Sequence, residues 1–142
     1  MRRITLDANV WAPGFTSLWG ASRRLIEHWE EGDFALVVSE HVLAELARTF
    51  DDPYYRSRFS PQQVKRSLML LRTDDLVVEL TTPVVGVATH PEDDLVLSTA
   101  LSGGASILCI RDKQLLRLRV YQTVSILSPG ELLAPLENEA SA

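Results

Sequence analysis

The stretch ITLDANV, residues 4–10, decides the fold, because its residues are typical of a buried strand that ends on an acid. Ile4 and Leu6 are typical of a buried strand, and Asp7 follows where such a strand leaves its sheet. Two interpretations of Asp7 are open: a carboxylate that faces a site at the sheet edge, or a side chain that caps the next turn. Its place at the end of a buried strand favours the site.

Strands and helices alternate along the rest of the chain. Strands that are apolar on both faces and alternate with helices indicate a parallel sheet covered on both sides, which binds ligands beyond the carboxyl ends of its strands. We therefore predict one α/β domain over residues 1–136 and a disordered tail over 137–142. Further strands are expected at 33–39, 76–80, 106–110 and 123–127, and helices at 21–32, 40–50, 62–72, 92–104, 113–116 and 129–136.

The composition limits the kind of protein. The 142 residues include 14 Lys and Arg against 19 Asp and Glu, a net charge of −5, which excludes a protein held on nucleic acid by bulk positive charge. The single Cys109 excludes an internal disulfide, and its apolar neighbours indicate a buried, reduced thiol. No apolar run approaches the ~20 residues that span a bilayer, and no signal-peptide pattern opens the chain. We expect a cytoplasmic protein with no membrane contact.

Three further acids fall near the carboxyl edge of the predicted sheet. Asp112 follows a strand, Asp93 lies in the first turn of a helix, and Glu45 lies inside another helix. Carboxylates that converge on one point need a counter-cation, and such hard oxygen ligands suit Mg²⁺ or Mn²⁺. A metal of this kind lowers the pKa of a bound water and stabilises charge on phosphorus, which points to hydrolysis of a phosphodiester.

Each of these acids also has a purely structural interpretation. Spacing places Glu45 away from the apolar stripe of its helix, which is typical of a solvated side chain. Asp93 is equally suited to complement a helix dipole, as we expect of Glu92 and Asp94. Asp112 is equally suited to cap the short helix after it. Four acids in this order on this architecture favour a shared site.

Taken together, the motifs resemble those of the PIN-domain family, in the branch of VapC-like toxins of bacterial and archaeal toxin–antitoxin pairs. The resemblance covers residues 3 to 136 and implies a three-layer α/β/α fold with a five-stranded parallel sheet. It also implies a Mg²⁺- or Mn²⁺-dependent ribonuclease that forms a homodimer and is inhibited by an antitoxin protein. The segments that carry it are ITLDANV (4–10), VVSEHVLAELARTF (37–50), HPEDDLVLSTALSGGASILCIRDKQLL (90–116) and TVSILSPGELL (123–133).

The resemblance also implies roles for individual residues. Asp7, Glu45, Asp93 and Asp112 correspond to the acids that bind the metal and carry catalysis in the family. Asn9 matches a polar position that supports the first aspartate by a hydrogen bond. The implied reaction is attack of a metal-activated water on the RNA phosphate, which leaves 5′-phosphate and 3′-hydroxyl ends.

The chain departs from the family pattern around the fourth acid. Ile110 and Arg111 stand where the family often has a small hydroxyl residue and a glycine, Gln114 replaces a frequent aspartate, and His90 takes a frequently acidic place. We interpret Arg111 as a contact to the scissile phosphate, because its guanidinium fits phosphate oxygens, with pairing to a site carboxylate as the alternative. These changes keep open a catalytically weakened PIN-fold protein that binds RNA or another protein.

Two other α/β enzyme classes also place an aspartate after the first strand. A haloacid-dehalogenase-like phosphatase needs a second aspartate at position 9, where this chain has Asn9. A response-regulator receiver needs an acid pair before its first helix and a phosphoacceptor after the third strand, and neither is evident. Both classes are therefore disfavoured.

Aromatic and basic residues outside these motifs have several interpretations. Trp11, Phe15 and Trp19 are suited to stack on bases, to pack on a partner chain or to pack in the core, and core packing is favoured for at least one. Solvated faces are favoured over an RNA path for three cation pairs, and no catalytic role is predicted for two helix-surface histidines. These are Arg23 and Arg24, Arg56 and Arg58, Lys65 and Arg66, and the histidines His28 and His41.

Overall fold

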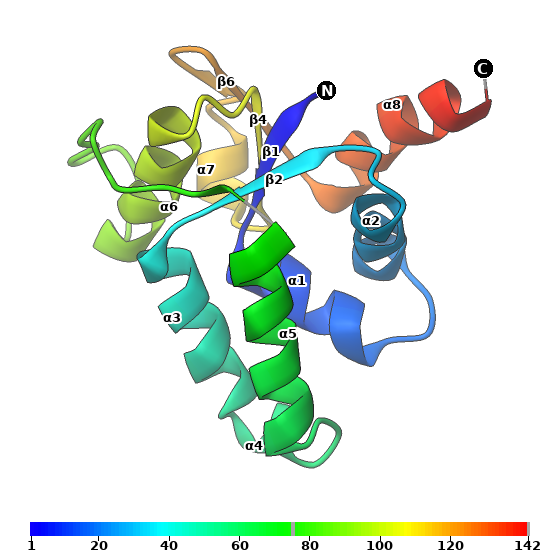
Figure 1. The fold of residues 1–142 in the computed structure, drawn as a ribbon. Coiled ribbons are helices and arrows are strands. Elements are labelled where there is room, and N and C mark those ends of the chain that lie inside the picture. The colour runs from blue at the N-terminus through cyan, green and yellow to red at the C-terminus, as the bar shows by residue number, and fades with distance from the viewer. Residues whose placement is uncertain (75, 142) are drawn as a thin grey trace.

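The structure, a computed structural model, describes the fold of residues 1–74 and 76–141. Within these residues one sheet has six strands in the order β3-β2-β1-β4-β6-β5 (Figure 1). The first strand is central, and it pairs in parallel with β2 on one side and β4 on the other. The strands are β1 (Arg3–Leu6), β2 (Ala35–Val38), β3 (Leu76–Val77), β4 (Ile107–Cys109), β5 (Val120–Tyr121) and β6 (Val124–Leu127).

The sheet has one strand more than the five that were predicted. The five expected parallel strands are present, and β5 adds a sixth at the edge, antiparallel to β6. A two-residue turn joins β5 to β6, and Gln122 in that turn has φ 52°. This backbone conformation is usually taken by Gly or Asn, so the sequence lacked the ordinary signal of a hairpin.

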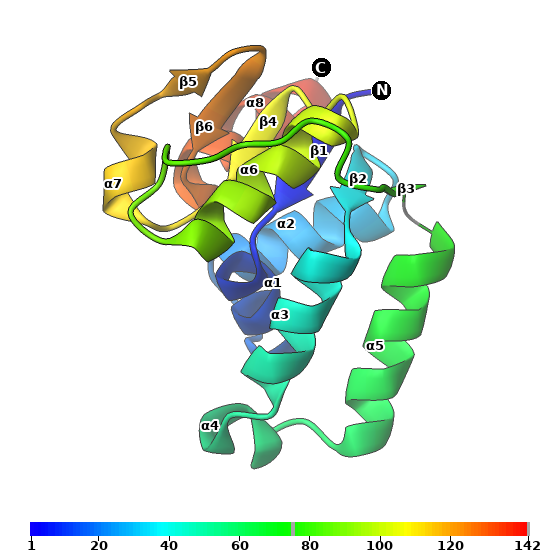
Figure 2. The ribbon, with the colours of Figure 1, turned by 90° about the vertical axis from the view of Figure 1, so that its left-hand side faces the viewer.

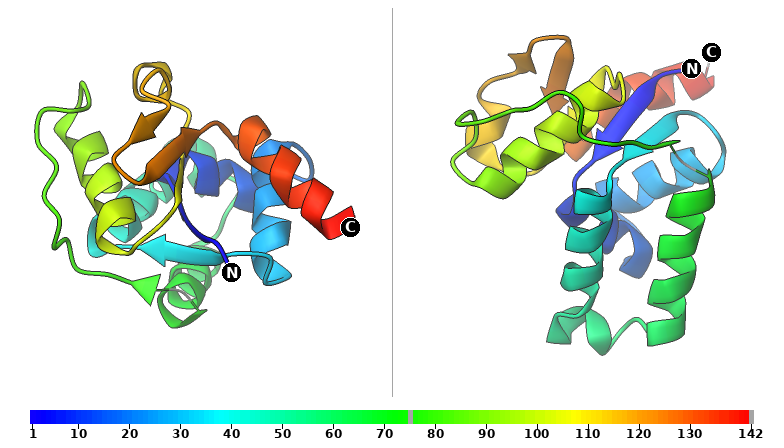
Figure 3. Two further views of the ribbon diagram at one scale, coloured as in Figure 1. Left: turned by 90° about the horizontal axis from the view of Figure 1, so that it is seen from above. Right: turned by 60° about the vertical axis from the view of Figure 1, so that its left-hand side comes forward.

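Helices cover both faces of the sheet, as the predicted three-layer α/β/α fold requires (Figures 2 and 3). Side chains along each strand alternate between two cores: in β2, Leu36 and Val38 face one core and Val37 the other. The second core contains α6 (Pro91–Ser102) and α7 (Lys113–Leu116), and the first contains α1 (Ala8–Thr16), α2 (Ala21–Glu30) and α8 (Pro129–Ser141). The predicted buried thiol is confirmed: Cys109 is free and buried, and burial raises its pKa to about 12.

A pair of helices extends away from one edge of the sheet (Figures 1 and 2). These are α3 (Glu40–Phe50) and α5 (Pro61–Asp74), joined through the short helix α4 (Pro53–Arg56). The predicted cap of α3 is confirmed, because the Ser39 hydroxyl accepts a hydrogen bond from the Val42 N–H at 3.3 Å. At the far end of the pair, the rings of Phe50 and Phe59 stack with centroids 5.1 Å apart.

Helix α1 follows Asp7 directly and was not predicted; Pro13 and Gly14 within it are poor helix formers. Gly14 is required there by close packing on α2: a Cβ at this position would lie 2.5 Å from Cγ1 of Ile26 and 2.7 Å from the Ser22 carbonyl oxygen. Packing on α2 therefore stabilises α1, although the local sequence of α1 is unfavourable for a helix.

The C-terminal segment differs from the disorder predicted for residues 137–142. Helix α8 continues through Ser141, and residue 142 lies outside the described residues. Ion pairs of Arg24 with Glu137 and of Arg2 with Glu139 hold this last part of the helix. None of the helices in the described part of the chain has the length and apolar character that crossing a membrane requires.

Candidate active site

An open cleft of about 660 Å³ lies where β1 ends. Its walls come from the start of α1, the exposed side of α3, α4 and the first turn of α6, which are far apart in sequence. The predicted site acids Asp7, Glu45 and Asp93 line it, and so does Asn9. The other lining residues are Ala8, Arg48, Thr49, Asp52, Tyr54 and Tyr55.

Asp7 occupies the N-cap position of α1, but its side chain makes no capping hydrogen bond. The alternative that Asp7 serves to cap the following turn is therefore wrong. The residue is only 5% exposed, and this burial raises the pKa of its carboxyl to about 6. The negative charges of Glu45 and Asp93 raise this pKa further, while the Ala8 backbone N–H and His41 lower it.

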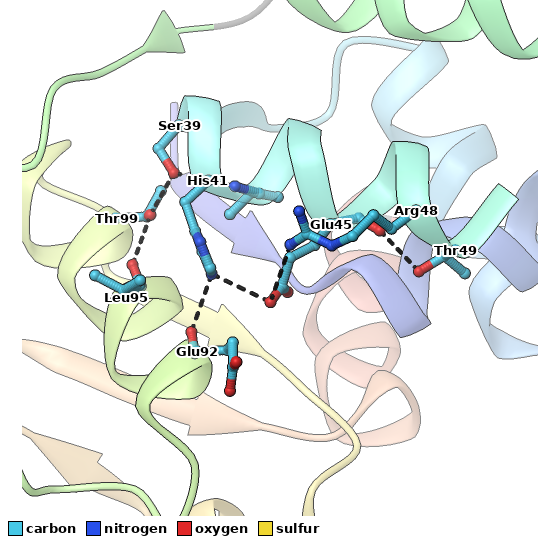
Figure 4. Close-up of polar contacts among 9 residues, drawn as sticks. Ser39, His41, Glu45, Arg48, Thr49, Glu92, Leu95 and Thr99 are labelled. Atoms are coloured by element: carbon cyan, nitrogen blue, oxygen red, sulfur yellow. Dashed lines mark hydrogen bonds and ion pairs between the residues drawn. The ribbon is translucent and has the colours of Figure 1, made fainter. Parts of the chain in front are cut away.

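Glu45 faces the cleft, and the expectation of a solvated side chain is wrong. Its side chain is 19% exposed, and its Oε1 lies 3.3 Å from His41 Nε2 and 3.9 Å from Arg48 Nη2 (Figure 4). Burial raises the pKa of this carboxyl, Arg48 lowers it, and Asp93 raises it. Helical spacing failed because it locates only the stripe that faces the core, whereas the start of α6 covers a second side of α3.

His41 is a site residue that the sequence interpretation missed. Figure 4 shows its ring reaching from α3 to the first turn of α6, where Nε2 lies 3.1 Å from the Glu92 carbonyl oxygen. A carbonyl oxygen only accepts hydrogen bonds, so Nε2 carries a hydrogen that it donates there. His41 thus ties the helix of Glu45 to the helix of Asp93. The one sequence signal was its position four residues before Glu45.

Asp93 and Asp94 are adjacent in α6 but lie in different environments. Asp93 is half-buried in the cleft, and burial raises the pKa of its carboxyl, with the charge of Asp112 as the next cause. Asp94 is 5% exposed and accepts hydrogen bonds from three backbone N–H groups. Asp94 lies in the first turn of α6, where it was predicted to complement the helix dipole, and it also fixes a loop, which was not predicted. The donors are Gly86 (3.0 Å), Val87 (3.2 Å) and Ala88 (2.7 Å).

The cap interpretation of Asp112 is confirmed, and Asp112 is not among the residues that line the cleft. Its Oδ2 accepts a hydrogen bond from the Leu115 N–H at 3.0 Å, so it caps α7. It also lies near enough to Asp93 to raise the pKa of that carboxyl. The Asp112 side chain is thus a neighbour of the cleft acids that is already engaged in holding a helix end.

The other predicted residues around the fourth acid make contacts within the fold. Arg111 Nη2 donates to the Ser22 hydroxyl at 2.7 Å, and Arg111 is not among the residues that line the cleft. It has no ion pair within the described residues, so pairing with a site carboxylate is not seen. The Gln114 side chain accepts a hydrogen bond from Thr89.

Asn9 and the predicted aromatic residues are placed differently from the expectation. Asn9 is exposed and lines the cleft, but no hydrogen bond joins it to Asp7 in the described part of the chain. Trp11 is fully buried and stacks on Phe15, with ring centroids 5.6 Å apart, so both belong to core packing. Trp19 is 79% exposed and is not among the lining residues.

The donor set of the cleft suits a hard divalent cation. Hard carboxylate oxygens from three elements face a solvent-accessible cleft, and the buried Asp7 carboxyl carries no capping bond. Across the residues described, three potential ligand atoms within 4.8 Å of one another occur only at the end of α2, in His28, Glu31 and Asp33. The cleft acids are spaced more widely than this, so a divalent ion bound there would contact one or two carboxylates directly and keep several waters.

Fold and cleft together define a class: an α/β protein with an acidic cleft at the carboxyl edge of a mostly parallel sheet. The sequence model of the family described as PIN domain matches residues 3–114, from the start of β1 into α7. The chain belongs to the PIN-domain family. PIN domains are generally nucleases, which are hydrolases, and they generally use divalent metal ions.

A solved structure supports the same fold. The chain is similar to the crystal structure of FitAcB from Neisseria gonorrhoeae, with a TM-score of 0.55 and 15% sequence identity. The similarity covers 89% of this chain and 98% of that chain. At this identity the likeness is one of fold. A comparison with curated proteins gave no significant match.

Proposed function

We propose that this protein is a Mg²⁺- or Mn²⁺-dependent endoribonuclease and the toxin of a type II toxin–antitoxin pair. It acts in the cytoplasm as a homodimer and is inhibited by a cognate antitoxin. The observation that carries the proposal is Asp7: a buried carboxylate without a capping bond, opposed by Glu45 and Asp93, in a chain that belongs to a nuclease family. Such an arrangement destabilises the isolated protein and is explained by a cation that it binds.

We propose roles for individual residues from where they lie in the cleft. Asp7, Asp93 and Glu45, with Asp112 beside them, would hold the metal, which supplies activation of a water and stabilisation of charge on phosphorus. Arg48 is the cation that lines the cleft, and its exposed guanidinium is available for a phosphate oxygen of the substrate. His41 fixes the orientation of Glu45 relative to the start of α6.

A second candidate function is a PIN-fold protein with weakened catalysis that binds RNA or a partner protein. The surroundings of the fourth acid favour it. Asp112 caps α7, Gln114 bonds to Thr89, and Arg111 bonds to Ser22, so these side chains are engaged in structural contacts. Cleavage measurements separate this candidate from the nuclease.

The deciding experiment compares cleavage of total RNA by the wild type and by Asp7→Asn, with Mn²⁺ and with a chelator. We expect cleavage by the wild type with Mn²⁺ alone, and at least about a hundred-fold less by Asp7→Asn. Asp51→Asn is the matched control, because this carboxylate is 80% exposed and lies outside the lining set. Equal cleavage by wild type and Asp7→Asn, or none by the wild type, would overturn the catalytic claim.

A further inference from the structure

Two tyrosines form the wall of the cleft beyond Arg48. Tyr54 and Tyr55 both line it, and their rings meet edge to face, with centroids 5.0 Å apart and planes at 83°. Both belong to α4, whose first turn is fixed because Asp52 accepts a hydrogen bond from the Tyr54 N–H at 3.0 Å. The sequence interpretation assigned no role to either ring.

The position of the pair is anchored in the core. Tyr55 packs edge to face on Phe50, with centroids 5.8 Å apart, and Phe50 stacks on Phe59. The Arg58 guanidinium carbon lies 3.8 Å from the centroid of the Tyr54 ring, and its Nη1 donates to the Tyr54 carbonyl oxygen at 2.8 Å. Tyr54 nevertheless remains 54% exposed. The ring is therefore held in place with Arg58 over one face, and more than half of the residue stays open to solvent.

The order of groups along the cleft suits a single nucleic acid strand. Glu45 and Arg48 lie about one turn apart on α3, and the chain then passes through Asp52, the N-cap of α4, to Tyr54, so the lining runs from the acids past Arg48 to the ring. A phosphate at the acids, a backbone contact at Arg48 and a base on Tyr54 follow this order. Aromatic rings beside a cation are how proteins bind unpaired bases without reading their sequence.

We propose that Tyr54, positioned by Tyr55 and Arg58, is a stacking platform for an unpaired base of single-stranded RNA next to the scissile phosphate. The choice of RNA rests on the proposed function, but stacking itself does not require cleavage. A base inside a duplex already stacks on its neighbours, so the platform selects single strands over duplexes.

The test measures binding of an end-labelled, single-stranded oligouridine RNA by fluorescence anisotropy in the presence of a chelator, so that no cleavage occurs. We expect Tyr54→Ala to bind about ten-fold more weakly, within a range of roughly five- to a hundred-fold. Tyr54→Phe keeps the ring and should bind as the wild type does. Trp19→Ala is the matched control, because it removes an exposed ring outside the cleft.

Two further readings separate stacking from charge. The salt dependence of binding should be the same for Tyr54→Ala and wild type, because no phosphate contact is lost, whereas Arg48→Ala should reduce it. An RNA of equal length with abasic residues should bind the wild type about ten-fold more weakly than oligouridine does. This last comparison needs no variant, so it decides the matter even where Tyr54→Ala folds poorly by circular dichroism.

Several outcomes would overturn the platform: equal binding by wild type and Tyr54→Ala, equal affinity for abasic RNA or for duplex, a similar loss in Trp19→Ala, or no binding by the wild type. Failure of the nuclease proposal looks different. Tyr54-dependent binding without cleavage in Mn²⁺ rejects the nuclease and keeps the platform. Cleavage in Mn²⁺ together with RNA binding that does not depend on Tyr54 rejects the platform and keeps the nuclease.

Discussion

Asp93 and Asp94 are neighbours in the first turn of α6, yet the fold treats their carboxylates in opposite ways. The Asp94 carboxylate accepts hydrogen bonds from three backbone N–H groups of one loop, and these bonds fix the loop. Asp93 faces the cleft beside Asp7, Glu45 and Asp112, and no hydrogen bond to its carboxylate is found in the described residues. A carboxylate surrounded by donors stabilises the fold, whereas one surrounded by other acids lowers stability unless a proton or a bound cation neutralises its charge.

The same contrast sorts the remaining buried acids. Asp7 and Glu45 belong with Asp93, because burial and neighbouring acids raise the pKa of each. Asp112 stands between the two kinds, since it caps α7 and also neighbours Asp93. The hydrogen-bond donors around each acid therefore distinguish the carboxylates that hold the fold from those that the fold leaves among other acids.

The largest effect is expected for a change at Asp93, the acid of the pair that faces the cleft. Asp93→Asn should reduce Mn²⁺-dependent RNA cleavage by at least about a hundred-fold and change the free energy of unfolding little, because its carboxylate holds no part of the fold. Parallel cleavage assays and urea unfolding check this. Glu92→Gln is the control, since that exposed neighbour carries the same charge. Loss of stability without loss of cleavage would place Asp93 with the structural acids.

The next largest effect is expected for a change at Asp94, the acid of the pair that fixes a loop. Asp94→Asn puts an amide donor against three backbone donors, so the free energy of unfolding should fall by about 3 kcal/mol. Cleavage per folded molecule, measured at a temperature where the variant is native, should stay within about three-fold of wild type. Urea unfolding gives the first quantity and a single-turnover assay the second. An unchanged unfolding midpoint would contradict the structural role.

Asp7 should carry a stability penalty that depends on pH. Its pKa is about 6 in the folded protein against 3.8 in the unfolded chain, so the folded state holds the proton more tightly. The penalty is therefore absent below about pH 4, grows between pH 4 and 6, and is complete above pH 6. Without metal, Asp7→Asn should be more stable by about 2 kcal/mol at pH 7.5 and equal to wild type near pH 4. Unfolding series at both pH values test the sign.

A bound cation should relieve that same penalty. Adding Mn²⁺ or Mg²⁺ at millimolar concentration should raise the Tm of the wild type by a few degrees, because the ion binds only the folded cleft. Asp7→Asn and Asp93→Asn should lose most of this shift, while Asp94→Asn should keep it. A thermal-shift titration at constant ionic strength makes the measurement. An equal shift in all four proteins would indicate a site elsewhere.

The smallest effect separates the two roles of Asp112. Asn is as good an N-cap as Asp, so Asp112→Asn should leave stability unchanged and lower cleavage through loss of charge alone. Asp112→Ala removes the cap as well and should cost about 1 kcal/mol of stability. Comparing the two variants in unfolding and cleavage assays assigns each role. If both cleave like wild type, Asp112 only caps α7.

Several features of the fold and site could be predicted because their causes are local. The alternation of strands and helices, the Ser39 cap and the position of Asp7 after a buried strand follow from neighbours a few residues away. Helix α1 could not be predicted, because its Pro13 and Gly14 are poor helix formers that packing on α2 overrides. The extension of α8 likewise depends on ion pairs with residues at the other end of the chain.

The sequence by itself determined that an acid ends the central strand and that three more acids return to the same edge of the sheet. Only the tertiary structure decided that Glu45 faces the cleft, that His41 ties α3 to α6, and that Tyr54 is part of the same wall. The physical reason is that spacing along a helix orients a side chain only toward its own core. The other groups that cover that side chain, and the donors and charges they bring, belong to elements far away in sequence.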